Sequence, residues 1–124
     1  MIDGNDLTHE IIGCAIEVHR ELGPGLLEST YEAALARELH LHGIPFQQQV
    51  PMPLTYKGVD LDCGYRVDLL VGSEVIVEIK ATSAILPIHE AQLMTYLKLA
   101  QKRTGLLINF NMLQLRDGIR RFVL

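Results

Sequence analysis

The sequence predicts an α/β fold in which helices pack against a mixed sheet, with the element order α-α-β-β-β-α-β-β. Two segments near the N-terminus repeat apolar residues at helical spacing. The middle of the chain alternates apolar and polar residues and then carries a run of β-branched residues, which favours strands. A later helical segment lies between two strand patterns, and this order implies a right-handed crossover and a parallel strand pair.

The length and charge limit the classes of protein. The 124 residues are enough for one domain with a real core, so residues 1–124 are expected to form a single domain. The net charge of −4 argues against a protein that holds nucleic acid mainly by charge. Two groups of cations form either a local basic surface or, as the simpler alternative, solvated charge. They are Lys98, Lys102 and Arg103, and Arg116, Arg120 and Arg121.

The sequence also predicts a location. The first residues lack the basic and apolar regions of a signal peptide. No apolar run approaches the roughly 20 residues that span a bilayer, so no membrane partner is expected. Cys14 and Cys63 are too few and too far apart to indicate a disulfide framework or a zinc site. We therefore expect a cytoplasmic protein with reduced thiols.

Two helices are expected near the N-terminus, over residues 6–22 and 27–42. Asp6 or Thr8 is the expected N-cap of the first, because either side chain can accept a backbone N–H bond. Gly23-Pro24-Gly25 separates the helices, since glycine favours a left-handed turn and proline cannot continue a helix. The expected buried stripes are Leu7, Ile11, Ala15, Val18 and Leu22 on the first helix, and Leu27, Tyr31, Ala34, Leu35 and Leu39 on the second.

The middle of the chain predicts three strands. Residues 46–56 are extended, and their prolines are typical of an edge strand. Residues 59–71 alternate, which places Arg66 and Asp68 on one face. The short turn Gly72-Ser73 makes residues 74–80 the antiparallel neighbour of that strand.

The last part of the chain predicts a helix and two strands. A helix is expected over residues 87–102, with Pro87 in its first turn. The apolar run over residues 106–110 is typical of a buried strand. Asp117-Gly118 indicates a hairpin turn, which leads into a final strand over residues 119–124.

Charged residues end the strand over residues 74–80. Glu78 and Lys80 share one face of it, and alone they would be an ordinary ion pair at an exposed strand end. The neighbouring strand sets Asp68 at about the same depth, so two carboxylates and a lysine converge. Glu28 starts the second helix. Either its charge is there because the helix dipole favours a negative charge in the first turn, or its side chain reaches into the protein toward the same point.

These residue types fit phosphodiester hydrolysis. Carboxylate oxygens from Glu28, Asp68 and Glu78, with the backbone carbonyl of Ile79, are the hard ligands that Mg²⁺ or Mn²⁺ prefers. Such an ion lowers the pKa of a bound water and stabilises charge on a phosphate. Lys80 can orient the water or neutralise the transition state. The sequence therefore predicts a site that uses Mg²⁺ or Mn²⁺ as its cofactor.

The same residues resemble a known signature. Asp68…Glu78-Ile79-Lys80 is similar to the D-(x)n-ExK motif of the PD-(D/E)XK nuclease superfamily, whose restriction-endonuclease-like core has a similar element order. Gln92-Leu93-Met94-Thr95-Tyr96 resembles the QxxxY motif of the exonuclease branch. Gly25-Leu26-Leu27-Glu28-Ser29-Thr30-Tyr31 resembles the namesake motif of the small bacterial GxxExxY proteins.

The resemblance implies roles for individual residues. Glu28, Asp68 and Glu78 are expected to hold the metal, Lys80 to be the catalytic lysine, and Gln92 and Tyr96 to position the metal site or the nucleic-acid backbone. His19 resembles a helix histidine that some members bring to the metal, or it is a packed histidine. Tyr31 is either a substrate contact or a core tyrosine bonded to Glu28. Arg66 pairs with an acid or touches a phosphate.

The expected function is metal-dependent hydrolysis of DNA or RNA. The alternative is a nuclease-fold binding or regulatory module that acts through a protein partner and does not use its catalytic residues. The chain carries almost no insertions that could form a nucleic-acid groove, so a homodimer or a partner that completes the groove is a further expectation. Residues 113–116 and the C-terminal strand are the candidate edge for such a dimer.

Overall fold

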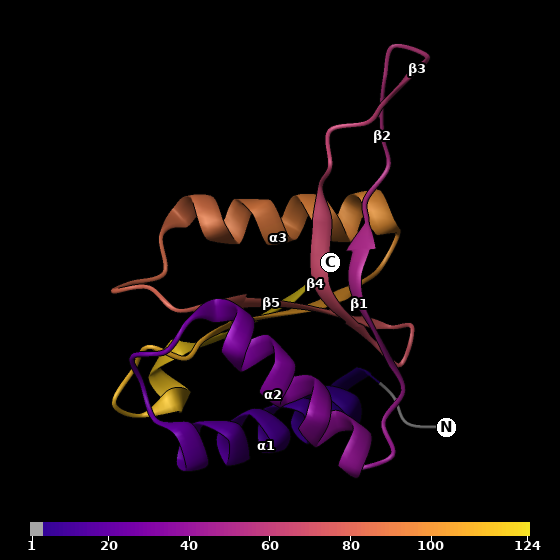
Figure 1. Cartoon of the computed structure of the whole chain (residues 1–124). Coiled ribbons are helices and arrows are strands. Elements are labelled where there is room, and N and C mark those ends of the chain that lie inside the picture. The colour runs from indigo at the N-terminus through magenta and orange to yellow at the C-terminus, as the bar shows by residue number, and fades with distance from the viewer. Residues whose placement is uncertain (1–3) are drawn as a thin grey trace.

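A computed structural model describes residues 4–124, and it has helices on both faces of a central sheet (Figure 1). The helices are α1 (Gly4–Leu22), α2 (Glu28–Leu41), α3 (Pro87–Ala100) and the short 3₁₀ helix η1 (Leu115–Gly118). The strands are β1 (Phe46–Pro51), β2 (Leu54–Tyr56), β3 (Val59–Leu61), β4 (Arg66–Val71), β5 (Val75–Lys80), β6 (Thr104–Asn109) and β7 (Ile119–Val123).

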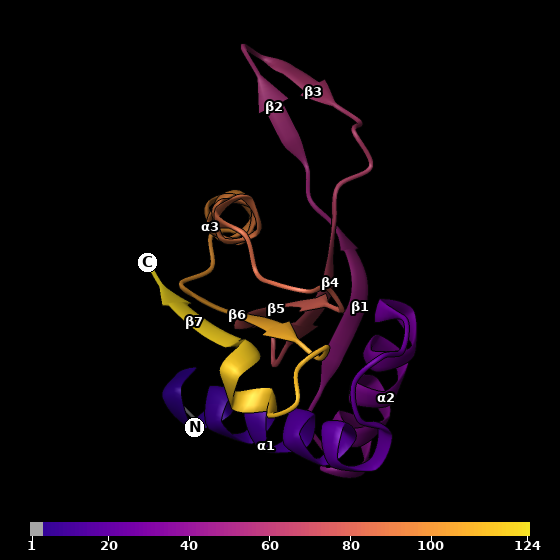
Figure 2. The same cartoon turned by 90° about the vertical axis from the view of Figure 1, so that its left-hand side faces the viewer.

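The central sheet has five strands in the order β1-β4-β5-β6-β7. Only the β5–β6 pair is parallel, as the strand–helix–strand order predicts, and the other three neighbouring pairs of this sheet are antiparallel. Figure 2 shows α1 and α2 below the sheet and α3 above it. The predicted α/β fold with a mixed sheet is confirmed.

Alternation along β5 supplies side chains to both hydrophobic cores. Val75, Val77 and Ile79 are buried in the core between the sheet and helices α1 and α2. Ile76 is buried on the opposite face, in the core beneath α3. Since side chains two apart in a strand share a face, Glu78 projects to the α3 side with Ile76.

The expected long strands over residues 46–56 and 59–71 are each divided in two. Pro51 and Pro53 have no N–H to donate, and Gly64 has a positive φ of 70°, so the chain leaves the sheet near these residues. Strands β2 and β3 form a separate two-stranded sheet, which projects away from the body as a hairpin arm (Figure 1). Asp60 consequently lies on this arm, apart from the strand that carries Asp68.

Several helix predictions also need correction. Helix α1 begins at Gly4, so Asp6 and Thr8 lie within it and neither is its N-cap. Leu22 and Leu27, expected in the buried stripes, are exposed because the chain turns away from the core between α1 and α2. The expected hairpin turn at Asp117-Gly118 is part of η1. In residues 4–124 no helix combines the length and the apolar character needed to cross a bilayer.

Candidate active site

The pairing of β4 with β5 brings two carboxylates together. Leu69 pairs with Val77, and one further step along the antiparallel register sets Asp68 opposite Glu78. The ladder stops at this step, and the Asp68 carboxylate accepts a hydrogen bond from the backbone N–H of Ile79 at 2.8 Å. Asp68 thus takes the place of a strand partner at the end of β5.

Glu78 is a buried acid whose carboxyl group is only partly hydrogen-bonded within residues 4–124. Its side chain is only 5% exposed, and its Oε1 has no hydrogen-bond partner within the described residues. Burial, and next the negative charge of Asp68, raise the pKa of Glu78 to about 9, although Lys80 acts in the opposite direction. A divalent cation between Asp68 and Glu78 would neutralise the buried charge and give this oxygen a partner. The donor set therefore fits a metal ion.

The backbone of Ile79 adds an oxygen on the same side. In an extended strand the N–H and C=O of one residue point to the same edge. Because the N–H of Ile79 points to Asp68 on β4, its carbonyl also faces the β4 edge, where the strand pairing has ended. The carbonyl oxygen is thus available close to both carboxylates.

Lys80 is half-buried at the end of β5, beside Glu78. The loop that follows it is held by Asn109, the residue paired with Lys80 on β6. The fully buried amide of Asn109 accepts a bond from Thr82 N–H at 3.1 Å and donates one to the Thr82 carbonyl at 2.9 Å. This double hydrogen bond fixes the direction in which the chain leaves the site.

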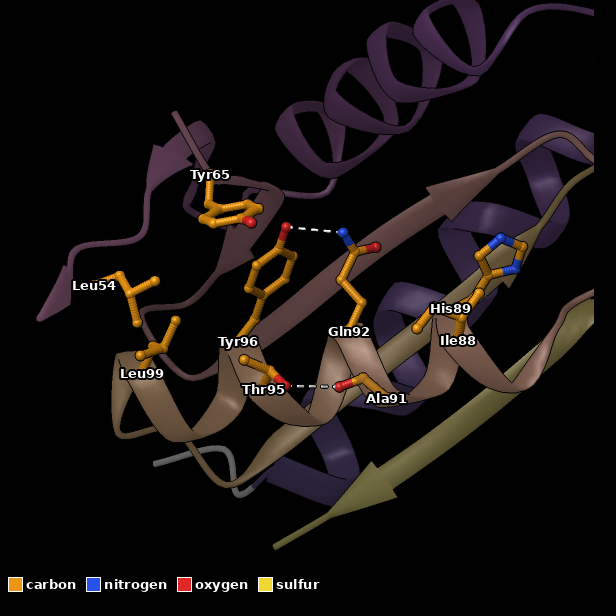
Figure 3. A pocket seen from close by; sticks show the side chains of 9 residues that line it. All are labelled: Leu54, Tyr65, Ile88, His89, Ala91, Gln92, Thr95, Tyr96 and Leu99. Atoms are coloured by element: carbon orange, nitrogen blue, oxygen red, sulfur yellow. Dashed lines mark hydrogen bonds between the residues drawn. The ribbon is translucent and has the colours of Figure 1, made fainter. Parts of the chain in front are cut away.

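Helix α3 supplies Gln92 and Tyr96 from above the sheet. The Gln92 side-chain amide donates a hydrogen bond of 3.1 Å to the Tyr96 hydroxyl (Figure 3). Burial raises the pKa of Tyr96, and the negative charge of Glu78 raises it further. These two side chains, expected at the site from their sequence motif, thus form a bonded pair next to the acids.

Glu32 is an acid near the site that the sequence reasoning missed. Gln49 donates hydrogen bonds to the Glu32 carboxylate at 2.8 Å and to the Asp68 carboxylate at 3.3 Å, so its amide bridges the two acids. Gln48 donates a third bond to Glu32 at 3.0 Å. Burial raises the pKa of Glu32, as does the nearby charge of Asp68. Since Glu32 follows Glu28 by four residues, helical spacing was the signal that could have indicated it.

Gln49 is also unusual in its backbone. It has a positive φ of 52°, which non-glycine residues rarely adopt. The residues before and after it pair with β4, so the irregularity is confined to the point opposite Asp68. The residue with this uncommon backbone conformation is thus the one whose side chain bridges Glu32 and Asp68.

Glu28 is the first residue of α2 and is exposed. Within residues 4–124, no three His, Cys, Asp or Glu side chains are grouped so that they could hold a metal ion. The expected three-carboxylate set of Glu28, Asp68 and Glu78 is therefore not assembled. Two carboxylates and a carbonyl come together instead, which suits an ion that retains several waters.

The other candidates have structural contacts. Tyr31 is fully buried, stacks on Phe110 at 4.6 Å, and donates its hydroxyl hydrogen to the Gly23 carbonyl, so it does not bond Glu28. His19 lies 2.7 Å from the Met112 carbonyl through Nε2 and joins no metal cluster among the described residues. Arg66 is exposed and donates to the Gln49 carbonyl at 3.3 Å.

Comparison with known proteins agrees with this geometry. A family model described as the PD-(D/E)XK nuclease superfamily matches residues 5–122, nearly the whole chain. Among curated proteins and among solved structures, no match reaches significance. The matched span includes β4 with Asp68 and β5 with Glu78 and Lys80. The chain belongs to the PD-(D/E)XK nuclease superfamily.

Proposed function

We propose that the protein is a metal-dependent phosphodiesterase that acts on nucleic acid. The observation that carries the proposal is the buried carboxyl of Glu78, which faces Asp68 and lies beside Lys80. One of its oxygens has no hydrogen-bond partner among residues 4–124. Burying a carboxyl group without full hydrogen bonding lowers the stability of a fold, so packing alone does not explain Glu78. A cation site gives this acid a function. Membership of the nuclease superfamily supports the same proposal.

The proposed cofactor is Mg²⁺ or Mn²⁺, held by Asp68, Glu78 and the Ile79 carbonyl. A bound ion of this kind supplies an acidified water and charge stabilisation at a phosphate. Lys80 then orients the attacking water or neutralises charge that develops on the phosphate oxygens. Gln92 and Tyr96 position the nucleic-acid backbone over the acids. Gln49 and Glu32 hold Asp68 in place from the other side.

The decisive test is Lys80→Ala. Purified wild type with Mg²⁺ or Mn²⁺ should cut at least one member of a panel of single- and double-stranded DNA and RNA. Lys80→Ala should lose this activity and keep its thermal unfolding midpoint. The matched control Lys98→Ala removes an exposed lysine from α3 and should cut normally. Equal residual cutting by wild type and Lys80→Ala would indicate a contaminant and contradict the proposal.

Metal binding can be tested without activity. Calorimetry should show Mn²⁺ binding to the wild type that Asp68→Ala reduces strongly, because the substitution removes one of the two proposed carboxylate ligands. The exposed Asp62→Ala is the control and should leave the Mn²⁺ affinity unchanged. The same Mn²⁺ affinity in Asp68→Ala as in wild type would exclude this metal site.

The second candidate is a nuclease-fold module that binds or regulates a partner. One observation favours it: in the described residues no three His, Cys, Asp or Glu side chains are grouped so that they could hold a metal ion. A second copy of the chain is one partner that such a module could bind. The edge strand β7 and Leu113, which is 91% exposed, support a homodimer. Light scattering gives the oligomeric state, and a monomer that cuts normally would exclude a required dimer.

Two narrower assignments complete the proposal. Gly25, Glu28 and Tyr31 support membership of the GxxExxY family within the superfamily. The free thiols of Cys14 and Cys63 support a reducing location such as the cytoplasm. Fractionation of cells expressing the tagged protein tests the location, and recovery outside the cytoplasm would contradict it.

A further inference from the structure

A hollow of about 480 Å³ lies between α3 and the base of the arm, and nine side chains line it (Figure 3). We call it the α3–arm pocket. Pockets of roughly 300–1,000 Å³ are typical of sites for small organic groups. Among the described residues, no Asp, Glu, Lys or Arg lines this pocket. Its chemistry therefore suits an uncharged group.

Two tyrosines form an aromatic wall of the pocket. Tyr96 on α3 is buried, whereas Tyr65, just before β4, is 46% exposed. Their ring centroids are 6.4 Å apart and the rings are tilted by 57°. Figure 3 shows the ring of Tyr65 beyond the hydroxyl end of Tyr96. An accessible ring in this position offers a stacking surface to a flat ligand.

The pocket also carries a few polar groups. Gln92 uses its amide nitrogen for Tyr96, and its amide oxygen accepts no hydrogen bond within the described residues. Nδ1 of His89 accepts a bond from the Leu86 N–H at 3.0 Å, so the neutral ring carries its proton on Nε2. An amide oxygen and an imidazole N–H beside aromatic walls match the hydrogen-bonding edge of a planar heterocycle.

The pocket adjoins the candidate active site at Tyr96. Tyr96 and its hydrogen-bond partner Gln92 both line the pocket. Tyr96 is close enough to Glu78 to experience its charge. A nucleotide whose phosphate is held at Asp68, Glu78 and Lys80 would therefore have the pocket beside it.

We infer that the α3–arm pocket receives one unstacked nucleobase of the substrate, next to the phosphate at the candidate active site. This inference rests on the proposed function and adds a substrate class: single-stranded or otherwise unpaired nucleic acid. Bases inside a duplex are stacked and paired, so they cannot enter such a pocket without being extruded.

The charge of the protein supports an unpaired substrate. Duplex binding depends mainly on phosphate contacts from lysine and arginine, but this chain has a net charge of −4. The arm does not provide a basic surface, since Lys57 is accompanied by Asp60 and Asp62. Stacking of bases on aromatic side chains is the other common source of affinity for single strands.

The test measures binding in the full chain carrying Lys80→Ala, so that the probes stay intact. The probes are labelled oligothymidine, oligouridine, an abasic oligomer of equal length and a duplex, each with Mg²⁺ in a fluorescence anisotropy titration. We expect a single-stranded probe with bases to bind more tightly than the abasic oligomer and the duplex. The two pyrimidine probes distinguish DNA from RNA.

The variants are placed at two exposed residues of the pocket, Tyr65 and Ile88. Tyr65→Ala should weaken binding of the base-containing probe by about tenfold, the scale of one lost stacking contact. It should leave the abasic oligomer unchanged. Tyr65→Phe keeps the ring and should bind like the parent. Ile88→Ala trims an exposed wall residue without touching either tyrosine and should cause a smaller loss in the same direction.

The outcomes separate this inference from the proposed function. Unchanged affinity in both Tyr65→Ala and Ile88→Ala, or an equal loss for the abasic oligomer, would overturn the base pocket even if the wild type cuts nucleic acid. Base-dependent binding in a chain whose wild type never cuts would support the pocket and contradict the hydrolysis.

Discussion

At the scale of single residues, the burial of Glu78 is expected to lower the stability of the fold. The acid is buried in the α3-side face of the sheet, with one oxygen unpartnered among the described residues. A buried carboxyl without full hydrogen bonding is costly, and the nearby Asp68 increases the cost. Lys80 offsets part of it. In the absence of metal, the carboxyl is expected to retain a proton at neutral pH.

This protonation predicts how stability depends on pH when metal is absent. Below pH 4.5 the carboxyl is protonated in both the folded and the unfolded chain. Between pH 4.5 and about 9 the unfolded chain releases the proton while the folded chain keeps it, so rising pH favours unfolding. Glu78→Gln should flatten this dependence and raise the free energy of unfolding at pH 8 by about 1–3 kcal/mol.

Urea unfolding of wild type and Glu78→Gln in chelator, from pH 5 to pH 9, checks this prediction. Parallel pH profiles would contradict it. Added Mg²⁺ or Mn²⁺ at pH 8 should stabilise the wild type by mass action and should have little effect on the variant. The metal titration is a control, because it tests whether the cost of burying Glu78 is relieved by the proposed ion.

Gln49 is the second residue whose role can be measured. Its amide joins Glu32 to Asp68, so Gln49→Ala should leave Asp68 less well oriented. Loss of such a supporting contact typically costs 10–100-fold in metal affinity or activity, and we expect a reduction on the order of tenfold in Mn²⁺ affinity. Gln47→Ala, an exposed substitution on the same strand, is the matched control. Equal Mn²⁺ affinities in the two variants would exclude the supporting role.

At the scale of elements, the end of β5 is held by its parallel neighbour β6. Asn109 is opposite Lys80 and is fully buried, and its amide satisfies both backbone groups of Thr82. The loop after a parallel strand has no ladder of its own, so a side chain supplies the missing hydrogen bonds. The position of Lys80 therefore depends on a residue 29 positions later in the chain.

Asn109→Ala should destabilise the protein by about 1–3 kcal/mol, because the N–H and C=O of Thr82 lose their partners. It should also lower the proposed nucleolytic activity by more than the unfolded fraction explains, since the loop after Lys80 is released. Thermal and urea unfolding with parallel activity assays measure both effects. Gln114→Ala removes an exposed amide nearby and is the control. Wild-type stability in Asn109→Ala would show that the double hydrogen bond is not important.

At the scale of the whole molecule, a packed body carries a separate arm. Both hydrophobic cores draw their residues from the helices and the central sheet, and neither contains a residue between Met52 and Val67. The arm is closed at its base by a hydrogen bond of 2.8 Å from the Met52 N–H to the Tyr65 carbonyl. The body is expected to fold without the arm.

Replacing residues 54–63 with a short glycine-serine turn should change the thermal unfolding midpoint by no more than about 4 °C, or less than about 1 kcal/mol. Leu69→Ala, a core substitution of about 2–5 kcal/mol, is the contrasting control. Differential scanning calorimetry measures both. A large fall in the midpoint of the arm-deleted protein would show that the arm contributes to the folded body.

Much of this architecture follows from short-range patterns in the chain. β-Branched residues and their alternation predicted β5 and the face that carries Glu78, and the turn Gly72-Ser73 predicted the register with Asp68. Both depend on residues that are close in sequence. The prolines at 51 and 53 indicated an irregular strand, but their local signal could not give the direction of the arm.

The remaining features depend on contacts between distant segments. Glu32 comes near Asp68 only because α2 packs against the sheet and Gln49 adopts an uncommon backbone conformation between them. Tyr31 is buried because it stacks on Phe110, far along the chain. Residue type and spacing were enough to predict a pair of acids and a lysine at one strand end. How deeply Glu78 is buried, and which neighbours support the pair, followed only from the packing of helices and strands that are remote in sequence.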